Sequence, residues 1–193
     1  MHKNRYFGRN ASDKHFLSNK TMPEFITKSL PAVFVIALAA LLTGCSQNDA
    51  QKKFEEEAFA QPSGITQTDV QGKIVTEDSD DWRIGPMFKG YMEVESPAFP
   101  NPVSNGQNLE IHLNITGIES ISGLEVMVRD ENDNWRSIYL DSQSSLPPGL
   151  YTFQLNPSSF SYTNNYQNAV GLHRVYLFDL NNNLITYGDV RVQ

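Results

Sequence analysis

The chain of 193 residues contains one cysteine, Cys45, and few histidines. A single thiol can form neither an intrachain disulfide nor a thiolate zinc site, so an apolar core has to hold the fold together. Residues 45–193 include two histidines, His112 and His173, without the His-Glu spacing of zinc enzymes, a Gly-rich phosphate loop or a nucleophile elbow. The sequence therefore predicts a protein that is not an enzyme and that binds no cofactor.

The chain also lacks an apolar run long enough for an ordinary membrane-spanning helix. The uncharged segment 31–42 has 12 residues, whereas a bilayer core asks for about 20. Six basic and two acidic residues precede it. A short apolar run behind a basic flank is typical of a signal peptide. We therefore expect residues 1–44 to direct export, with translation beginning at Met22 to give a signal of ordinary length.

The apolar run ends in Leu42-Thr43-Gly44-Cys45, which resembles the lipobox of bacterial lipoproteins. The resemblance implies that signal peptidase II recognises Leu42, Thr43 and Gly44, cuts before Cys45, and leaves Cys45 acylated and inserted in membrane lipid. Three acyl chains anchor a protein durably, whereas one binds marginally. A chance Gly-Cys pair behind a hydrophobic signal, or an uncut membrane anchor, is the alternative interpretation.

Residue Ser46 gives no inner-membrane retention signal of the aspartate kind, which favours the outer membrane. Acidic residues with lysines at 52–57 resemble surface-export signals of Bacteroidetes lipoproteins, so periplasmic and surface-facing positions both stay open. We expect residues 45–68 to form a flexible tether that could make one helical turn around residues 55–60. Without the charged residues of 1–44, nine basic and twenty acidic residues remain, a formal net charge of −11. Such a charge excludes nucleic acid as a plausible partner.

Alternating apolar and polar residues predict short strands in the second half of the chain. Leu109 to Thr116 places leucine and isoleucine on one face, and 124–129 repeats the pattern. Two further strands, 172–178 and 184–192, flank an Asn-rich turn. About seven such strands predict an all-β antiparallel sandwich, Ig-like or fibronectin type III-like, over residues 97–193. Residues 69–96 are expected to add a strand and an aromatic segment packed on this domain.

Several turn and strand motifs resemble the Ig-like domain of flagellar hook-capping proteins and the Pro-Asn-Pro modules of Bacteroidetes exoproteins. The residues that carry the resemblance are Ala98 to Val103, Val126 to Asp130, Leu146 to Tyr151, and Gly171 leading into Tyr176 to Asp179. The resemblance implies an Ig-like fold that makes protein contacts. We therefore expect an accessory or structural lipoprotein with an envelope protein as its partner.

One acidic stretch resembles a calcium-binding loop. The residues at loop positions one, three, five and twelve are Asp130, Asn132, Asn134 and Asp141. Trp135 replaces the glycine that such a loop needs at position six, and an aspartate replaces the final glutamate. These departures favour a hairpin turn between two strands, and we expect no metal site, with a calcium loop as the alternative.

Aromatic residues near Asn and Ser suggest a second kind of ligand. Phe160, Tyr162 and Tyr166 lie in the segment 158–169, and Trp135 stands on an earlier strand. Rings stack on the apolar faces of sugars while amides bond their hydroxyl groups. The sequence thus offers a surface glycan-binding or adhesion module as the alternative to a structural or accessory role, unless these rings pack under their own domain.

Overall fold

The computed structural model describes residues 49–193 except 118–119 and 142–144. They belong to a compact unit that spans residues 43–193. The lipobox and Cys45 lie outside the described residues. Within the described part, no helix has both the length and the hydropathy needed to cross a bilayer.

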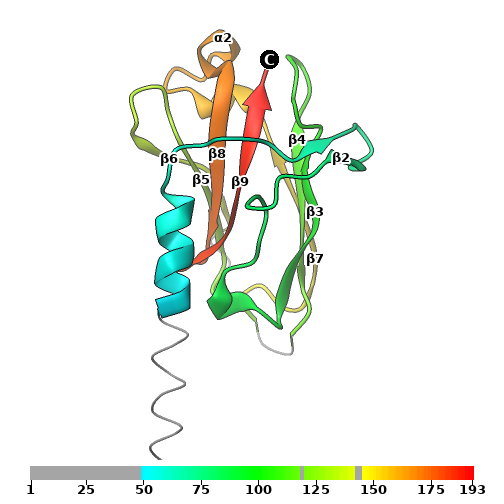
Figure 1. The fold of residues 1–193 in the computed structure, drawn as a ribbon, viewed down its shortest axis with the longest axis vertical. Coiled ribbons are helices and arrows are strands. Elements are labelled where there is room, and N and C mark those ends of the chain that lie inside the picture. The colour runs from blue at the N-terminus through cyan, green and yellow to red at the C-terminus, as the bar shows by residue number, and fades with distance from the viewer. Residues whose placement is uncertain (1–48, 118–119, 142–144) are drawn as a thin grey trace, which may run out of the picture. The chain divides into compact units, whose positions relative to one another are not determined.

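The domain is an antiparallel β-sandwich (Figure 1). One sheet has the order β3-β4-β7 and the other the order β6-β5-β8-β9, while β1 and β2 form a separate small hairpin. The strands are β1 Gln67–Thr68, β2 Ile74–Thr76, β3 Met92–Phe99, β4 Leu109–Ile115, β5 Leu124–Arg129, β6 Trp135–Asp141, β7 Gly149–Leu155, β8 Gly171–Phe178 and β9 Leu184–Val192. Three short helices are η1 Pro86–Phe88, η2 Pro157–Phe160 and α2 Tyr166–Ala169. The predicted all-β Ig-like sandwich is thereby confirmed.

The core lies between the two sheets, where the predicted alternation places the apolar side chains. Leu109, Ile111, Leu113 and Ile115 of β4 are all buried, whereas the residues between them are partly exposed. Val126 and Val128 of β5 face them from the other sheet as part of the same cluster. Because a strand's side chains alternate between its faces, the other side of β5 and β8 points away from this core.

Two hairpin turns share one construction. Asp130 accepts backbone N–H bonds from Asn132 and Asn134 at 2.9 and 3.0 Å, which closes the turn between β5 and β6. Asp179 accepts the equivalent bonds from Asn181 and Asn183 at 2.9 and 2.8 Å between β8 and β9. The fourth residue of each turn has a positive φ, 62° and 63°. The spacing Asp-x-Asn-x-Asn therefore encodes a turn, because short carboxylates bond the backbone two and four residues ahead.

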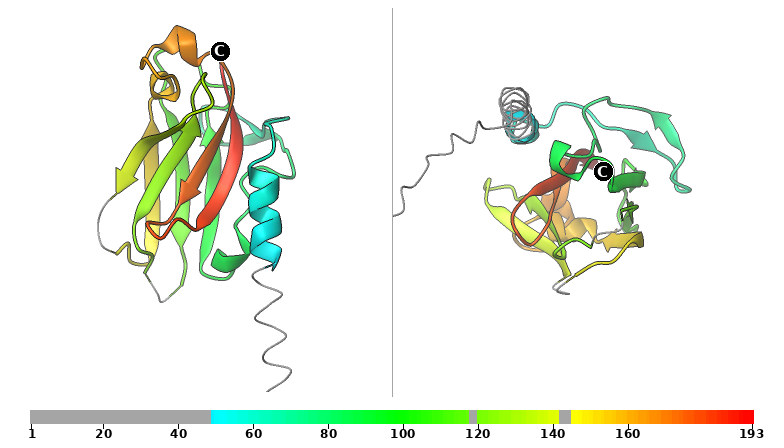
Figure 2. Two further views of the ribbon diagram at one scale, coloured as in Figure 1. Left: turned by 90° about the vertical axis from the view of Figure 1, so that its left-hand side faces the viewer. Right: turned by 90° about the horizontal axis from the view of Figure 1, so that it is seen from below.

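The segment predicted as a flexible tether is instead largely structured. Residues 49–58 form a helix that packs on the outer face of the sheet containing β8 and β9 (Figures 1 and 2). Phe54 and Ala58 of the helix are buried against Tyr176, Leu184 and Tyr187. The prediction of a tether failed because two apolar residues in a strongly charged run make a narrow stripe, which becomes stable through contact with the sheet rather than through the helix itself.

The segment between the small hairpin and β3 covers the outer edge of β9. The backbone N–H of Trp82 donates to the Tyr187 carbonyl and that of Gly85 donates to the Ile185 carbonyl, each at 2.7 Å. Trp82 and Phe88 of this segment enter the main core. The edge of β9 is therefore paired along this stretch, which limits edge-to-edge association there.

Candidate functional site

Four rings gather on the outer face of the four-stranded sheet, beside the helix. They are Phe59 just after the helix, Trp135 of β6, and Tyr176 and Phe178 of β8, and we call them the aromatic surface. The Trp135 ring lies 4.8 Å from Tyr176 and 6.0 Å from Phe59 between centroids, both edge-on. Tyr176 and Phe178 stack at 6.3 Å. Such edge-on and stacked pairs fix the rings relative to one another.

Two rings of the aromatic surface are open to solvent. Trp135 is 42% exposed and Phe59 is 44% exposed, while Tyr176 lies buried beneath them. The Arg129 guanidinium stands 4.7 Å from the Trp135 ring centroid and is held by an ion pair with Asp133 at 2.7 Å. Exposed tryptophan beside arginine is the composition that carries much of the free energy of binding at protein interfaces.

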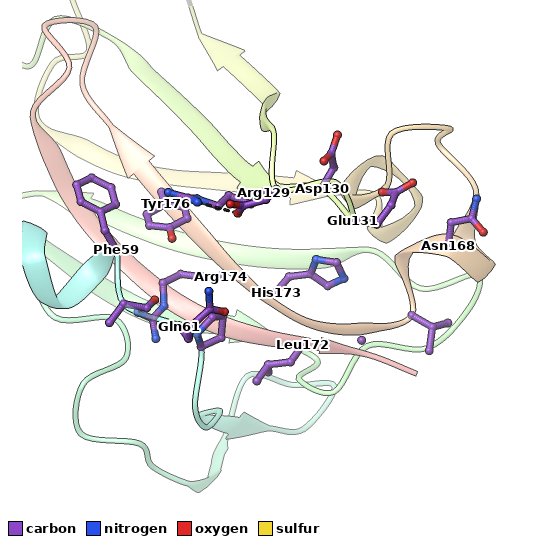
Figure 3. Close-up of a pocket in the computed structure, with 15 residues that line it drawn as sticks. Phe59, Gln61, Arg129, Asp130, Glu131, Asn168, Leu172, His173, Arg174 and Tyr176 are labelled. Atoms are coloured by element: carbon purple, nitrogen blue, oxygen red, sulfur yellow. Dashed lines mark hydrogen bonds and ion pairs between the residues drawn. The ribbon is translucent and has the colours of Figure 1, made fainter.

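A groove of about 290 Å³ adjoins the aromatic surface (Figure 3). Its walls come from residues 59–62 after the helix, from the β5–β6 turn, and from the segment joining α2 to β8. Phe59 and Tyr176 lie at one end of it in Figure 3, and Glu131 and Asn168 at the other. Three chain segments far apart in sequence thus line one groove.

The groove contains two buried polar atoms without a hydrogen-bond partner among the described residues, Nε of Arg129 and Oδ2 of Asp130. Other polar groups of the groove are already bonded: Glu131 accepts the backbone N–H of Tyr162 at 2.9 Å, and the His173 ring bonds the Ala169 carbonyl at 2.7 Å. A buried donor and a buried acceptor left unpaired cost free energy unless water or a ligand bonds them.

A buried ion pair underlies the groove and holds the helix in place. Arg174 of β8 binds Asp189 of β9 through two bonds, Nε to Oδ1 at 2.6 Å and Nη2 to Oδ2 at 2.8 Å. Its Nη1 donates to the carbonyl oxygens of Glu57, Ala58 and Ala60, each at 3.1 Å. These are orphan carbonyls at the end of a helix, where a cation is favourable. Arg174 therefore fastens the end of the helix to the sheet.

Two further side chains extend this polar cluster. The Asp81 carboxylate accepts the backbone N–H groups of Asp189 at 2.7 Å and Thr66 at 2.6 Å. Asn101, the central residue of the Pro-Asn-Pro motif, donates to the Thr66 and Asp189 carbonyls and accepts from the Arg191 N–H. The motif therefore joins the N-terminal segment to β9, a structural role.

Burial gives Asp81 an unusual titration. Desolvation, which outweighs its two N–H donors, raises the pKa of Asp81 from 3.8 to about 7. Between pH 3.8 and about 7, Asp81 keeps its proton in the folded chain but has released it in the unfolded chain. The contribution of Asp81 to the free energy of unfolding therefore falls as the pH rises from about 4 to about 7.

We expect the melting temperature of the chain to decline across this window and the Asp81→Asn variant to decline less, because its neutral side chain does not titrate. Thermal unfolding followed by circular dichroism from pH 4 to 8 measures both, as the linkage relation requires. Parallel curves for the two proteins would show that Asp81 does not titrate there.

The four predicted aromatic ligand residues do not form one site. Phe160 is fully buried in the core and Tyr166 donates its hydroxyl to the Gln193 main-chain oxygen, so these two rings serve the domain itself. Tyr162 is exposed, with the Arg136 guanidinium 6.0 Å from its ring centroid. Trp135 belongs to the aromatic surface with different partners. Phe160 and Tyr166 thus follow the alternative interpretation, in which loop rings pack under their own domain, whereas Tyr162 and Trp135 are exposed.

The four residues of the alternative calcium loop are not brought together either. Oδ1 of Asp130 accepts hydrogen bonds from the backbone N–H groups of Asn132 and Asn134 within the turn. Asp141 pairs with Leu124, whereas Trp135 pairs with Arg129, so Asp141 lies at the opposite end of the β5–β6 hairpin. Among the described residues there is no group of three His, Cys, Asp or Glu side chains placed to hold a metal ion.

Sequence reasoning missed Phe59, Tyr176 and Phe178 as members of the aromatic surface. Tyr176 and Phe178 alternate with Val175 and Leu177, so both faces of β8 are apolar. A strand that is apolar on both faces signals a second covered face. The sequence does not show whether a helix or a ligand covers that face.

No family model matches this chain. No curated protein matches it either. Among solved structures, T. fusca AA10A has 15% identity over 47% of this chain and 51% of its own, with a TM-score of 0.32. An LPMO from Kitasatospora papulosa has 11% identity over 47% and 49%, with a TM-score of 0.33. A CARDB domain from Pyrococcus furiosus has 18% identity over 53% and 86%, with a TM-score of 0.29. These similarities carry no argument about function.

Proposed function

We propose that this chain is a non-catalytic lipoprotein of the bacterial cell envelope. Acyl chains on Cys45 hold it in the outer membrane, and its Ig-like sandwich binds an envelope protein. The observation that carries the protein contact is the aromatic surface, where Trp135 and Phe59 stay exposed although a helix covers the neighbouring part of the same sheet face. Aromatic side chains next to arginine make strong anchors for a protein partner.

The lipid anchor is tested in cells by metabolic labelling with a palmitate analogue. The wild-type chain is expected to carry the label and to sediment with outer membranes. The Cys45→Ser variant, which cannot form a thioether, is expected to lose both the label and the sedimentation. Equal labelling of the two proteins would rule out Cys45 as the acylated residue.

The protein contact is tested by crosslinking in intact envelopes followed by affinity purification. We expect Trp135→Ala to weaken capture of the partner by about 2 kcal/mol, roughly 30-fold in affinity, as for a residue central to an interface. Tyr162→Ala is the matched control, since this ring is exposed but lies outside the aromatic surface. If both variants capture the same proteins as wild type, the aromatic surface is not the interface.

Glycan binding is the second candidate, favoured by the groove beside the rings. The exposed Trp135 and Phe59 rings supply stacking faces for a sugar, and the exposed polar side chains of Gln61, Glu131 and Asn168 line the groove where hydroxyl groups would lie. A glycan array distinguishes the two candidates. Binding that is lost on Trp135→Ala and kept on Tyr162→Ala would replace the protein partner with a sugar, and an array without any binding removes this candidate.

A further inference from the structure

A second hollow, of about 460 Å³, lies between one face of the helix, from Ala50 to Glu57, and the segment 83–89. Phe54, Ile84 and Pro86 give it apolar walls, and the exposed side chains of Lys53 and Lys89 flank it. It shares no lining residue with the groove. The hollow therefore combines an apolar interior with cations at its opening.

The cations of this hollow are largely uncompensated. Arg83 is paired with Glu57 at 2.9 Å, whereas Lys53 and Lys89 form no ion pair with any described residue. The four lysines of residues 45–193 are Lys52, Lys53, Lys73 and Lys89. Three of them thus stand on the helix and just after η1, in a chain whose remaining charge is strongly negative. The lining of the hollow itself holds three cations, Lys53, Arg83 and Lys89, against one carboxylate, Glu57, although Asp49, Glu55 and Glu56 also lie on the helix. This excess of cations in the lining favours an anionic partner at the hollow.

Only a few residues of chain separate the proposed anchor, Cys45, from the helix beside this hollow. The Gln51 side chain donates to the Leu184 carbonyl and accepts from the Met87 N–H, both at 3.2 Å, which fixes the first described turn of the helix against η1 and β9. Arg174 fixes its last turn. Cys45 precedes residue 49 by four residues, which reach at most about 14 Å when fully extended. An acylated Cys45 would hold this end of the sandwich at the lipid headgroups.

We propose that the hollow flanked by Lys53 and Lys89 docks on anionic phospholipid headgroups of the membrane that carries the acyl chains of Cys45. This inference rests on the proposed lipid anchor. The lysines bind the phosphate charges, and the apolar walls lie against the interfacial part of the lipid. Docking supplies a second attachment beside the acyl chains and holds the domain in one orientation, as basic patches do for other lipid-anchored proteins.

The single thiol allows a direct test without cellular lipidation. The chain 45–193 is coupled through Cys45 to a maleimide lipid in vesicles that contain phosphatidylglycerol, and lysine acetylation rates are read by mass spectrometry. We expect Lys53 and Lys89 to react about fivefold more slowly than in the uncoupled protein, the factor for about 1 kcal/mol per lysine near an anionic surface. Lys73, next to β2 in the small hairpin, is the internal control and keeps its rate.

Vesicle composition and variants separate docking from mere proximity. Protection is expected to disappear on phosphatidylcholine vesicles and at high salt, which screens exposed charges. Lys52, which neighbours Lys53 on the helix, is expected to be protected as well. Lys53→Glu with Lys89→Glu is expected to remove this protection of Lys52, while Lys73→Glu leaves it unchanged. Unchanged rates at Lys53 and Lys89 on anionic vesicles, or equal protection on both lipids, would overturn the docking surface. The chemical coupling makes that result independent of the labelling test, so either proposal can fail alone.

Discussion

Replacement of Arg174 by alanine is expected to lower the free energy of unfolding of residues 45–193 by about 3–5 kcal/mol, the range for breaking a buried ion pair from one side. The substitution leaves the Asp189 carboxylate buried without its cation and removes the donor from three carbonyl oxygens at the helix end. A domain's whole stability is about 5–15 kcal/mol, so this is a large part of it. Urea denaturation followed by circular dichroism measures the loss.

Arg191 provides the matched control for Arg174, because it is an exposed arginine on the neighbouring strand β9. Its replacement by alanine is expected to change stability by less than about 0.5 kcal/mol. The two variants should also differ in limited proteolysis, with early cleavage around residues 49–62 when Arg174 is absent, because the helix end has lost its fastening. Equal losses for the two variants would show that the buried pair does not hold the helix.

Replacement of Trp82 by alanine is expected to cost about 3–5 kcal/mol, the range for deleting a large aromatic side chain from a core. Trp82 is 7% exposed and belongs to the main core cluster. Its ring fills the space above Gly188 of β9, where a Cβ atom would come within 2.2 Å of the ring. Removal of the ring leaves a cavity that the backbone of β9 cannot fill.

The chain contains two tryptophans, and the second is the control for the first. Trp135 is exposed on the aromatic surface, so Trp135→Ala is expected to cost much less, about 1 kcal/mol or below. Guanidinium unfolding of both variants makes the comparison. Gly188→Ala should destabilise as well, by about 1–3 kcal/mol, because the added methyl group meets the Trp82 ring. Comparable losses for the two tryptophan variants would contradict the packing described for Trp82.

The sheet strands could be predicted closely because their signal is local. Leu109 to Thr116 was predicted from alternation alone and forms β4 over Leu109–Ile115. The final hairpin was predicted over 172–178 and 184–192 and forms β8 and β9 almost as expected. A strand with one buried face alternates apolar and polar residues along its own sequence. The strand can therefore be recognised without knowledge of its neighbours in the sheet.

The helix and the aromatic surface could not be predicted, because their signal lies in contacts between distant segments. Phe54 and Ala58 form too narrow an apolar stripe to predict a stable helix, and the partners that stabilise it, Tyr176 and Tyr187, are on the last two strands. Phe59 and Trp135 become neighbours through the same docking. The segment 158–169 shows the opposite case. Its composition is typical of a binding loop, but its residue Phe160 is buried in the core.

The docked helix also constrains the order in which the chain can fold. Its first described hydrogen bond to the sheet joins Gln51 to Leu184 across 133 residues of sequence. Contacts of such long range form late, because a long loop has to close before they contribute. During synthesis, which starts at the N-terminus, residues 49–58 are therefore made long before β9, the strand on which they pack. Truncation before β9 should release residues 49–58 as well, so the first and last elements share one cooperative transition.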